Sequence, residues 1–407
     1  MEAAKVRQEM EAMQARLAGW RRSLHRIPEI SFDLPLTETA LRSFLSEAGI
    51  SLQESYDGPG VVALVRGERE TGPTVAIRAD IDALEIQEVE GREYGSTHPG
   101  KMHACGHDAH AAMALGAALF LHEHRAGWGG ALKLLFQPAE ETMGGAQRMV
   151  ECGALEDPRP DFILGQHIGN IWEELKAGQV GVAYIPMMAA TDAFNFTMKA
   201  AGGHGAYPHT TADPVLAVSA AITQLHTLVS RNVDPTDTAV ITVGEIHGGH
   251  ARNIIPTEVT IRGTVRTLRP EVRDLLEARI REVLEFSASV HRCGYEFNYY
   301  RISPVVRNDP KVADVVRQAA LDLLGPEDVR TISRPSLGGE DVAFFLERTP
   351  GCYFGLSAHN PKKGFYSHHH SPVFDIDESV LWRGSAVLAL SALRLFNGEV
   401  NGPEKNA

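Results

Sequence analysis

Three largely apolar runs in the first half of the chain predict buried strands at residues 74–80, 131–137 and 162–167. Runs of this length without polar alternation are typical of strands that are covered on both faces. Residues 107–124, between the first two runs, carry Ala, Met, Leu and Phe at helical spacing. Because strands alternate with a helix, the pattern predicts an α/β domain with a parallel sheet.

The order of elements changes after residue 193. The pattern predicts, in chain order, strand 194–200, helix 214–230, strands 239–246 and 259–267, helix 270–292 and strand 296–302. This βαββαβ order is that of a ferredoxin-like unit. Further helices are predicted at residues 310–324 and 378–396. We therefore expect a two-domain chain, with a catalytic α/β domain in two pieces at residues 1–186 and 301–407, and an inserted ferredoxin-like domain at residues 187–300.

Composition and charge exclude several classes of protein. The 407 residues carry 39 Lys and Arg against 52 Asp and Glu, a net charge of −13 with no basic cluster, so no nucleic-acid partner is expected. No stretch approaches 18 consecutive apolar residues, and the first 17 residues lack the apolar centre of a signal peptide. We expect a soluble, cytoplasmic protein without a membrane partner. The four cysteines form no CxxC pair, which argues against disulfides and a zinc ribbon.

Side chains that can bind metal or move protons follow the predicted strands. Asp80 ends the first, Glu140 and Glu141 follow the second after a proline, and His167 ends the third. Ligands of parallel sheets bind beyond the carboxyl ends of the strands, where these residues fall. Adjacent carboxylates can divide into a metal ligand and a general base, although solvated acidic pairs are also common. A histidine at a strand end either faces a site or is hydrogen-bonded in the core.

Further candidates lie at the start of the predicted helix and in two loops. Cys105 and His107 can direct a thiolate and an imidazole to one point, or be a buried cysteine and a capping histidine. The histidines at 368–370 indicate a metal site or a solvated loop. The glycines around His204 allow the backbone to approach a ligand closely, and a tight turn would explain these glycines equally well. A tight turn does not explain the two histidines, His204 and His209.

Taken together, five residues supply the ligands that a two-metal site needs, and Glu140 remains as a base. These five are Cys105, His107, Glu141, His167 and His370. The sequence contains no G-x-S-x-G elbow, no P-loop and no H-E-x-x-H motif, so the competing signatures are absent from it.

Eight stretches then match one known family in its own order. They are residues 24–32, 78–84, 102–110, 136–141, 202–209, 253–256, 339–341 and 370–374. With them the chain resembles, over nearly its whole length, the metal-dependent amidohydrolase branch of the M20 peptidase family. This group contains N-acyl-amino-acid amidohydrolases, hippurate hydrolases and auxin-conjugate hydrolases. The resemblance implies a zinc-peptidase-like catalytic domain with an inserted lid and dimerisation domain.

The resemblance also implies roles for the candidate residues. Two divalent cations are bound by Cys105, His107, Glu141, His167 and His370. The His-x-Pro pattern fits His370, with His369 as the alternative. Glu140 is implied as the general base and Asp80 as an acid that orients the site. Thiolate and imidazole suit Zn²⁺, Ni²⁺ or Co²⁺, and carboxylate also admits Mn²⁺.

In the inserted domain, the resemblance implies that His204 of the partner subunit and Asn253 approach the substrate, so a homodimer or a dimer-based homotetramer is expected. The implied reaction is hydrolysis of the amide bond of a small N-acyl amino acid. One alternative is an aminopeptidase or dipeptidase of the same fold, with Glu85 or Glu340 as an anchor for a free amine. Another is a ligand-binding relative without metals. Departures from the usual pattern, at Asn170 among other positions, leave the acyl group open.

Overall fold

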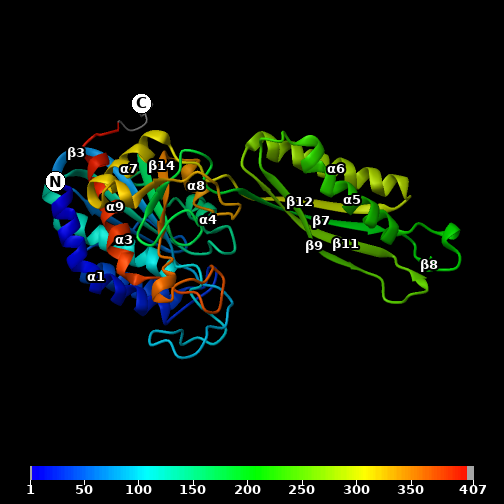
Figure 1. Cartoon of the computed structure of the whole chain (residues 1–407), viewed down its shortest axis with the longest axis horizontal. Helices are drawn as coiled ribbons and strands as arrows, with labels where there is room; N and C mark the ends of the chain where they lie inside the picture. Colours follow the sequence, from blue (N-terminus) through cyan, green and yellow to red (C-terminus); the bar gives the residue numbers. More distant parts are fainter. Residues whose placement is uncertain (1, 401–407) are drawn as a thin grey trace. The chain divides into compact units, whose positions relative to one another are not determined.

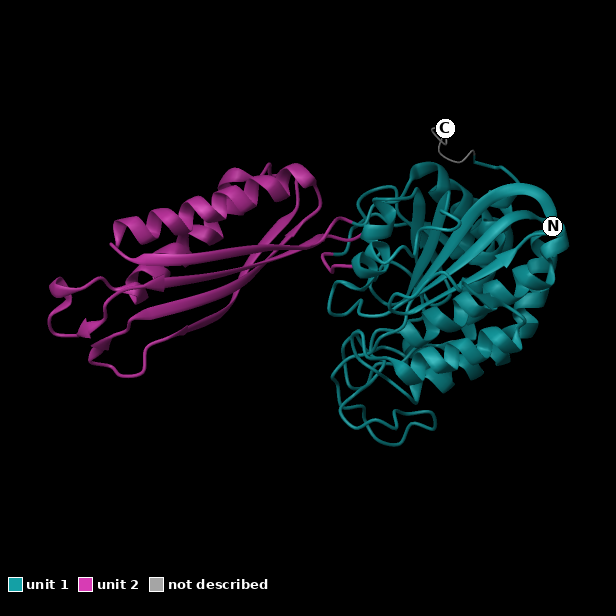
Figure 2. Cartoon of the chain, turned by 180° about the vertical axis from the view of Figure 1, so that it is seen from behind, with its two compact units in different colours: residues 1–187, 306–336, 341–407 teal, residues 188–305, 337–340 magenta. Residues whose placement is uncertain are grey.

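The computed structural model describes residues 2–400, which divide into two compact units (Figure 2). Within this range the larger unit holds residues up to 187, residues 306–336 and residues from 341 onward. The smaller unit holds residues 188–305 and the short segment 337–340. The chain therefore leaves the larger unit, completes the smaller one, and returns.

The larger unit is built on an eight-stranded sheet in the order β1-β2-β4-β3-β5-β14-β6-β13. Its strands are β1 (Ser51–Leu52), β2 (Val61–Arg66), β3 (Arg69–Asp80), β4 (Gly129–Gln137), β5 (Phe162–Gly169), β6 (Val180–Val182), β13 (Val329–Thr331) and β14 (Gly351–Ser357). The four central strands β4, β3, β5 and β14 run parallel to one another. By contrast, β1 and β2 pair antiparallel, as do β2 with β4 and β6 with β14. The sheet is thus mixed, and the expectation of a parallel sheet holds for its four central strands and for the pair of β6 with β13.

The helices of the larger unit are α1 (Ala3–His25), α2 (Pro35–Glu47), α3 (His107–Glu123), α4 (Gly145–Glu151), α7 (Pro310–Leu324), α8 (Ala343–Leu346) and α9 (Leu381–Phe396). Helices α1, α3 and α9 pack on one another, and α3 and α9 also contact β3 (Figure 1). All residues of α3 from His107 to Leu121 are buried. A helix that is apolar on every side must lie inside the protein, and α3 does.

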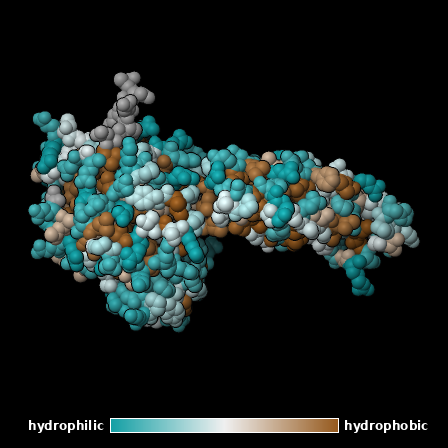
Figure 3. Space-filling model, turned by 45° about the horizontal axis from the view of Figure 1, so that its top comes forward, coloured by the Kyte–Doolittle hydropathy of each residue, from teal (hydrophilic) through white to brown (hydrophobic). Residues whose placement is uncertain are grey.

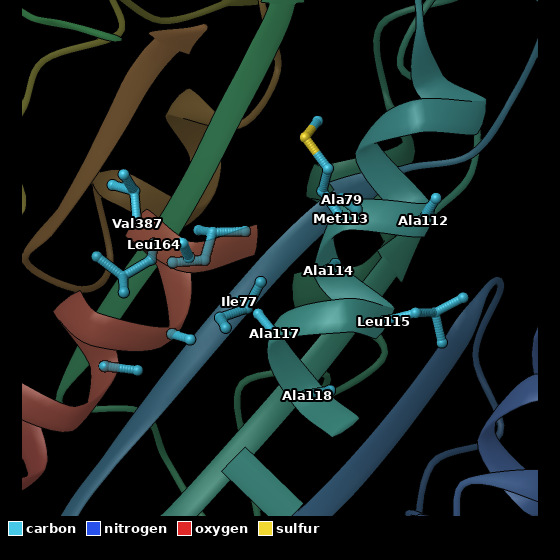
Figure 4. Close-up of a cluster of buried hydrophobic side chains, with 14 of the residues drawn as sticks. Ile77, Ala79, Ala112, Met113, Ala114, Leu115, Ala117, Ala118, Leu164 and Val387 are labelled. Carbon is cyan, nitrogen blue, oxygen red and sulfur yellow. The ribbon is translucent and has the colours of Figure 1, made fainter. Parts of the chain in front are cut away.

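The core of this unit joins the central strands to α3 and α9 (Figure 4). Ile77 of β3, Leu164 of β5, Met113 and Ala117 of α3 and Val387 of α9 belong to one buried cluster. Residues 378–396, which contain α9, are long and apolar enough to cross a membrane, but 83% of their most apolar window is buried inside the protein. The apolar character of α9 is therefore explained by its place in the core.

The smaller unit has its own four-stranded antiparallel sheet in the order β12-β7-β11-β9. Its elements are β7 (Ala190–Lys199), β8 (Gly203–His204), α5 (Pro214–Asn232), β9 (Ala239–Gly248), β10 (Ile254–Ile255), β11 (Glu258–Thr267), α6 (Pro270–Val290) and β12 (Gly294–Ser303). Helices α5 and α6 pack together on one face of this sheet (Figure 1). The four long strands and two helices follow one another as βαββαβ, and β8 and β10 pair separately.

Candidate active site

The carboxyl ends of the central strands bring distant parts of the sequence together. Asp80 is the last residue of β3 and pairs in register with Gln137, the last residue of β4. Glu140 and Glu141 follow three and four residues later, and His167 lies near the end of β5. Because β4, β3 and β5 are parallel neighbours, these side chains meet at the same edge of the sheet.

The start of α3 adds a thiol and an imidazole to this edge. Gly106, between Cys105 and His107, has a φ of 93°, in the left-handed region that favours glycine. A Cβ at this position would lie 2.7 Å from Cγ2 of Ile168 in β5. Glycine is therefore required both by the turn and by the close approach to β5, and the tight fit holds Cys105 and His107 at the edge of the sheet.

Potential metal-ligating atoms gather in several groups within residues 2–400, and two of these groups share Cys105. One contains Cys105, His107 and His167, and the other contains Cys105, Glu141 and His370. In each group the ligand atoms lie within 4.8 Å of one another. Sγ of Cys105 lies 3.6 Å from Nε2 of His167, and Nε2 of His370 lies 3.3 Å from Oε2 of Glu141.

Backbone carbonyls fix the orientation of two of the imidazoles. Nδ1 of His107 donates to the carbonyl of Asp82 at 2.9 Å, and Nδ1 of His167 donates to the carbonyl of Ile168 at 2.8 Å. The Nε2 atoms of both rings therefore face the site. Nε2 of His107 and Oε1 of Glu141 are buried and make no hydrogen bond within residues 2–400. A cation would satisfy both atoms, so the donor set fits a metal.

The charges around His107 also favour a bound metal ion. Burial acts to lower the pKa of His107, but the carboxylates of Asp80, Asp82 and Glu141 outweigh it and raise the pKa to about 10. Nε2 of His107 also lies 3.8 Å from Oε2 of Glu140. This excess of carboxylates over cationic groups is what a bound metal ion would neutralise.

The pKa of His167 is shifted in the opposite direction. Burial, together with the neighbouring rings of His110 and His369, holds the pKa of His167 well below its usual value of 6.5. The ring is therefore neutral at physiological pH, and its Nε2 lone pair faces Cys105. A neutral imidazole with a free lone pair is the form that binds a metal.

Asp80 lies at the centre of a buried network that sequence reasoning captured only in part. Oδ2 of Asp80 accepts from Arg78 at 2.9 Å and lies 3.7 Å from Nε2 of His107. Nδ1 of His110 donates to Oδ1 of Asp80 at 2.5 Å, while Nε2 of His110 accepts the backbone N–H of Ile168 at 2.9 Å. His110 was not predicted, although its position one helical turn after His107 is a usable signal.

Asp82 is a second residue that sequence reasoning did not single out. Its Oδ1 accepts the backbone N–H of Glu140 and its Oδ2 accepts that of Glu141, both at 3.1 Å. Ala139, just before the pair, has a φ of 55°, which is unusual for a residue with a side chain. Asp82 thus holds a strained turn from which both glutamates project.

The structure gives different surroundings to the two histidines that the sequence could not separate. His370 has a φ of 60°, and its backbone N–H donates to the carbonyl of Ala104 at 2.9 Å. Its ring lies beside Glu141. Nε2 of His369 instead accepts the backbone N–H of Asn170 at 3.1 Å, and Nδ1 lies 3.6 Å from Sγ of Cys105.

The remaining predicted residues, His204 and Asn253, lie in the smaller unit. Strands β8 and β10 place His204 opposite Ile254, and the backbone N–H of Gly205 donates to the carbonyl of Asn253 at 2.8 Å. Both side chains belong to exposed residues. The two predicted substrate-binding residues are therefore brought side by side by one short ribbon.

Comparison with known proteins identifies the family. The sequence pattern of "Peptidase family M20/M25/M40" matches residues 76–394. The chain belongs to this family. The match begins in β3 and ends in α9, so it includes every candidate residue described above.

Curated M20 relatives extend over nearly the whole chain. The chain is 39% identical over 394 residues to N-acetyl-L-cysteine deacetylase of Bacillus subtilis, covering 95% of this chain and 90% of that protein. It is 38% identical over 384 residues to IAA-amino acid hydrolase ILR1-like 4 of Arabidopsis thaliana, covering 93% and 85%. These relatives confirm the amidohydrolase branch that the sequence motifs indicated.

A solved M20 structure shares the fold. A Bacillus subtilis protein described as a dinuclear metal binding peptidase is 33% identical, with a TM-score of 0.81 and coverage of 95% of this chain and 99% of that chain. With the donor groups around Cys105, this likeness identifies the chain as a metal-dependent amidohydrolase of family M20.

Proposed function

We propose that this M20 enzyme hydrolyses the amide bond of N-acyl amino acids and releases the free amino acid and a carboxylic acid. The observation that carries the proposal is the place of Cys105 in two donor groups, one with His107 and His167 and the other with Glu141 and His370. The two ions of a two-metal hydrolase lie about 3.5–4 Å apart, close enough for one donor to contact both. The relatives named as a deacetylase and an IAA-amino acid hydrolase support an N-acyl amino acid as the substrate.

In this proposal five residues hold two divalent cations: Cys105, His107, Glu141, His167 and His370. When bound there, divalent cations would supply a water of lowered pKa and polarisation of the acyl carbonyl. Thiolate and imidazole favour Zn²⁺, Ni²⁺ or Co²⁺, and the carboxylate also accepts Mn²⁺. His370 is preferred over His369 because its ring lies beside Glu141, whereas both ring nitrogens of His369 face other partners.

Glu140 acts as the general base. Its residue is 5% exposed, and its carboxylate lies near Nε2 of His107. Glu140 takes a proton from the attacking water as the new C–O bond forms at the acyl carbon. It then passes that proton to the amide nitrogen as the C–N bond breaks. Proton transfer by a positioned group contributes about 10²–10⁴-fold to such a rate. Asp80, held by Arg78 and His110, is the acid that orients the site, and its Oδ2 lies 3.7 Å from Nε2 of His107.

The smaller unit supplies substrate recognition as a lid. His204 of the partner subunit donates a hydrogen bond to the acyl oxygen, a class of interaction that lowers the barrier by about 3–4 kcal/mol. The side-chain amide of Asn253 binds the α-carboxylate of the leaving amino acid. The support for this step is the pairing of β8 with β10, which holds the two residues together on an exposed ribbon.

The enzyme forms a homodimer, alone or as half of a homotetramer, in this proposal, and the surface of the smaller unit supports the dimer. β9 is an edge strand of its sheet, and Ile246 on it is 58% exposed. Val215 and Leu216 at the start of α5 are also exposed, and Figure 3 shows hydrophobic patches on this unit. An open edge beside apolar side chains favours pairing with a second copy. Cytoplasmic location stays a prediction from the sequence.

A hydrolysis screen tests the proposal. Metal-stripped enzyme is reconstituted with Mn²⁺, Zn²⁺, Ni²⁺ or Co²⁺ in turn and offered N-acetyl, N-benzoyl and indole-acetyl amino acids, with free dipeptides as the contrast. Turnover of an N-acyl amino acid that requires added metal is expected. Turnover of free dipeptides in its place would favour the aminopeptidase or dipeptidase. Metal-independent turnover would contradict the proposal.

A further inference from the structure

His369 is held in one orientation by a residue from the end of β5. The backbone N–H of Asn170 points at Nε2 of His369 at 3.1 Å. A backbone N–H can only donate, so Nε2 must accept and carries no proton. In the neutral ring the proton is therefore on Nδ1, which lies 3.6 Å from Sγ of Cys105. The backbone carbonyl of Cys105 also accepts from this ring.

The ring has little freedom to leave this position. Gly169 has a φ of 124°, and a Cβ there would lie only 2.2 Å from Nε2 of His369. The rings of Phe374 and His167 lie with their centroids 4.8 Å and 5.2 Å from that of His369. His369 thus fits against a glycine on one side and two rings on others, with Nδ1–H directed at Cys105.

His167 and His369 approach the same sulfur at the same distance with opposite chemistry. His167 presents a lone pair, because its Nδ1 donates to the carbonyl of Ile168. His369 presents an N–H, because its Nε2 accepts from Asn170. A lone pair beside a thiolate leaves room for a cation between them, whereas an N–H beside a thiolate forms a hydrogen bond.

We propose that His369 is a positioning residue that donates a hydrogen bond from Nδ1 to Sγ of Cys105 and thereby sets how strongly this sulfur binds the metal ions. The inference rests on the proposed function, because it takes Cys105 as a metal ligand. An N–H donated to a thiolate draws electron density from the sulfur, fixes its direction, and leaves its other lone pairs for the metals. Outer partners of this kind commonly change metal affinity about 10–100-fold.

Two variants separate the two nitrogens of the ring. The amide of Asn in His369→Asn can place an N–H where Nδ1 lies, whereas the amide of Gln in His369→Gln reaches the position of Nε2. His368→Gln, at the exposed histidine next in the tract, is the matched control. Each protein is stripped, loaded with Co²⁺, and measured for the sulfur-to-cobalt charge-transfer absorption and for Co²⁺ affinity by competition with a chelator.

The expected result is a difference between the two variants. His369→Gln should shift the charge-transfer band to longer wavelength and weaken Co²⁺ binding about 10–100-fold. His369→Asn and His368→Gln should keep the wild-type band and most of the affinity. Equal behaviour of the Asn and Gln variants would overturn the inference, and so would weaker Co²⁺ binding with an unchanged charge-transfer band. His369 would then only fill space or bind the backbone carbonyl of Cys105. A wild-type protein without the band would instead contradict Cys105 as a ligand, and with it the proposed function.

Discussion

The carboxylate of Asp82 accepts the backbone N–H of Glu140 at 3.1 Å. Its second oxygen accepts the N–H of Glu141, and its backbone carbonyl accepts Nδ1–H of His107. Asp82, which lies two residues beyond the end of β3, thus orders the turn after β4 and the first residue of α3. The proposed mechanism needs such an anchor, because a general base and a metal ligand at adjacent positions must point in different directions.

Asp82→Asn is expected to lower both metal content and turnover about 10–100-fold while the protein stays folded. The amide of Asn keeps one oxygen but places an NH₂ group against one of the two backbone N–H donors. One of the two hydrogen bonds is therefore replaced by a repulsive contact between two donors. Metal analysis and steady-state rates measure the effect. Asp57→Asn, at an exposed aspartate of the same unit, should change neither. Normal metal content in Asp82→Asn would show that the turn does not need the anchor.

Glu140→Gln and Glu141→Gln are expected to fail in different ways. Glu140→Gln should keep its metal and lose at least about 10²–10⁴-fold in kcat, because an amide preserves the shape of the base but takes up no proton. Glu141→Gln should lose metal, because an amide is a weaker ligand and carries no charge for the cation.

Elemental analysis beside kcat separates the two glutamates. Full metal with little turnover in the first variant, and little metal in the second, is the expected pair of results. Equal metal loss in both variants would mean that the two glutamates share one task. Near-normal turnover in Glu140→Gln would exclude Glu140 as the base.

Metal binding should strengthen as the pH rises. In the metal-free protein burial lowers the pKa of His107, but the carboxylates of Asp80, Asp82 and Glu141 raise it to about 10. The ring is therefore protonated at neutral pH, and the proton occupies the Nε2 that a cation needs. Displacing this proton makes the apparent affinity rise at least about tenfold per pH unit below pH 10, and the proton lost from the thiol of Cys105 steepens the slope further. Chelator competition between pH 7 and 9 measures this slope, and a flat profile would contradict it.

The same raised pKa fixes the sign of a stability effect in the metal-free protein. Because the folded pKa of His107 is about 10 against a usual 6.5, its charge stabilises the fold fully below about pH 6.5. This contribution is lost as the pH rises through about 10. The Tm difference between wild type and His107→Gln, both stripped of metal, should therefore shrink from pH 6 to pH 10. A constant difference would mean that the carboxylates do not hold the proton.

The centre of the fold could be predicted because its strands are long and apolar. β3, β4 and β5 are buried along their carboxyl-terminal halves, so their runs of apolar residues are unmistakable. β1, β6 and β13 have only two or three residues each, too few for any periodicity to show. The sequence pattern therefore does not reveal the antiparallel pairs that involve β1 and β6, and it predicts a parallel sheet.

The sequence could predict the part of the site that lies at the carboxyl ends of the central strands. Asp80, Glu140 and His167 meet because three neighbouring strands run the same way. The contrast between His369 and His370 depends instead on the backbone N–H of Asn170, 199 residues away in sequence from His369. The residue type at position 170 does not indicate where its backbone N–H points, so the sequence could not assign the tautomer of the His369 ring.

The last prediction tests whether each active site draws on two subunits. If His204 acts on the partner's metal centre, Glu140→Ala and His204→Ala proteins are each inactive alone. Unfolding them together and refolding the mixture should make half of the dimers hybrids by random pairing. In a hybrid one site carries both defects and the other carries neither. Activity should therefore return to about a quarter of the wild-type value per site, one half of the sites in one half of the dimers.

Action of His204 within its own chain gives a different result. Every site in every dimer would then carry one defect, and the mixture would stay as inactive as its parents. A wild-type sample refolded in the same way gives the reference rate, and separate refolding of each variant followed by mixing is the control for exchange after folding. A monomer in solution, or no recovery in the mixture, would exclude the trans assignment. Neither outcome would touch Cys105 or Glu140, because the metal chemistry rests on residues of the larger unit alone.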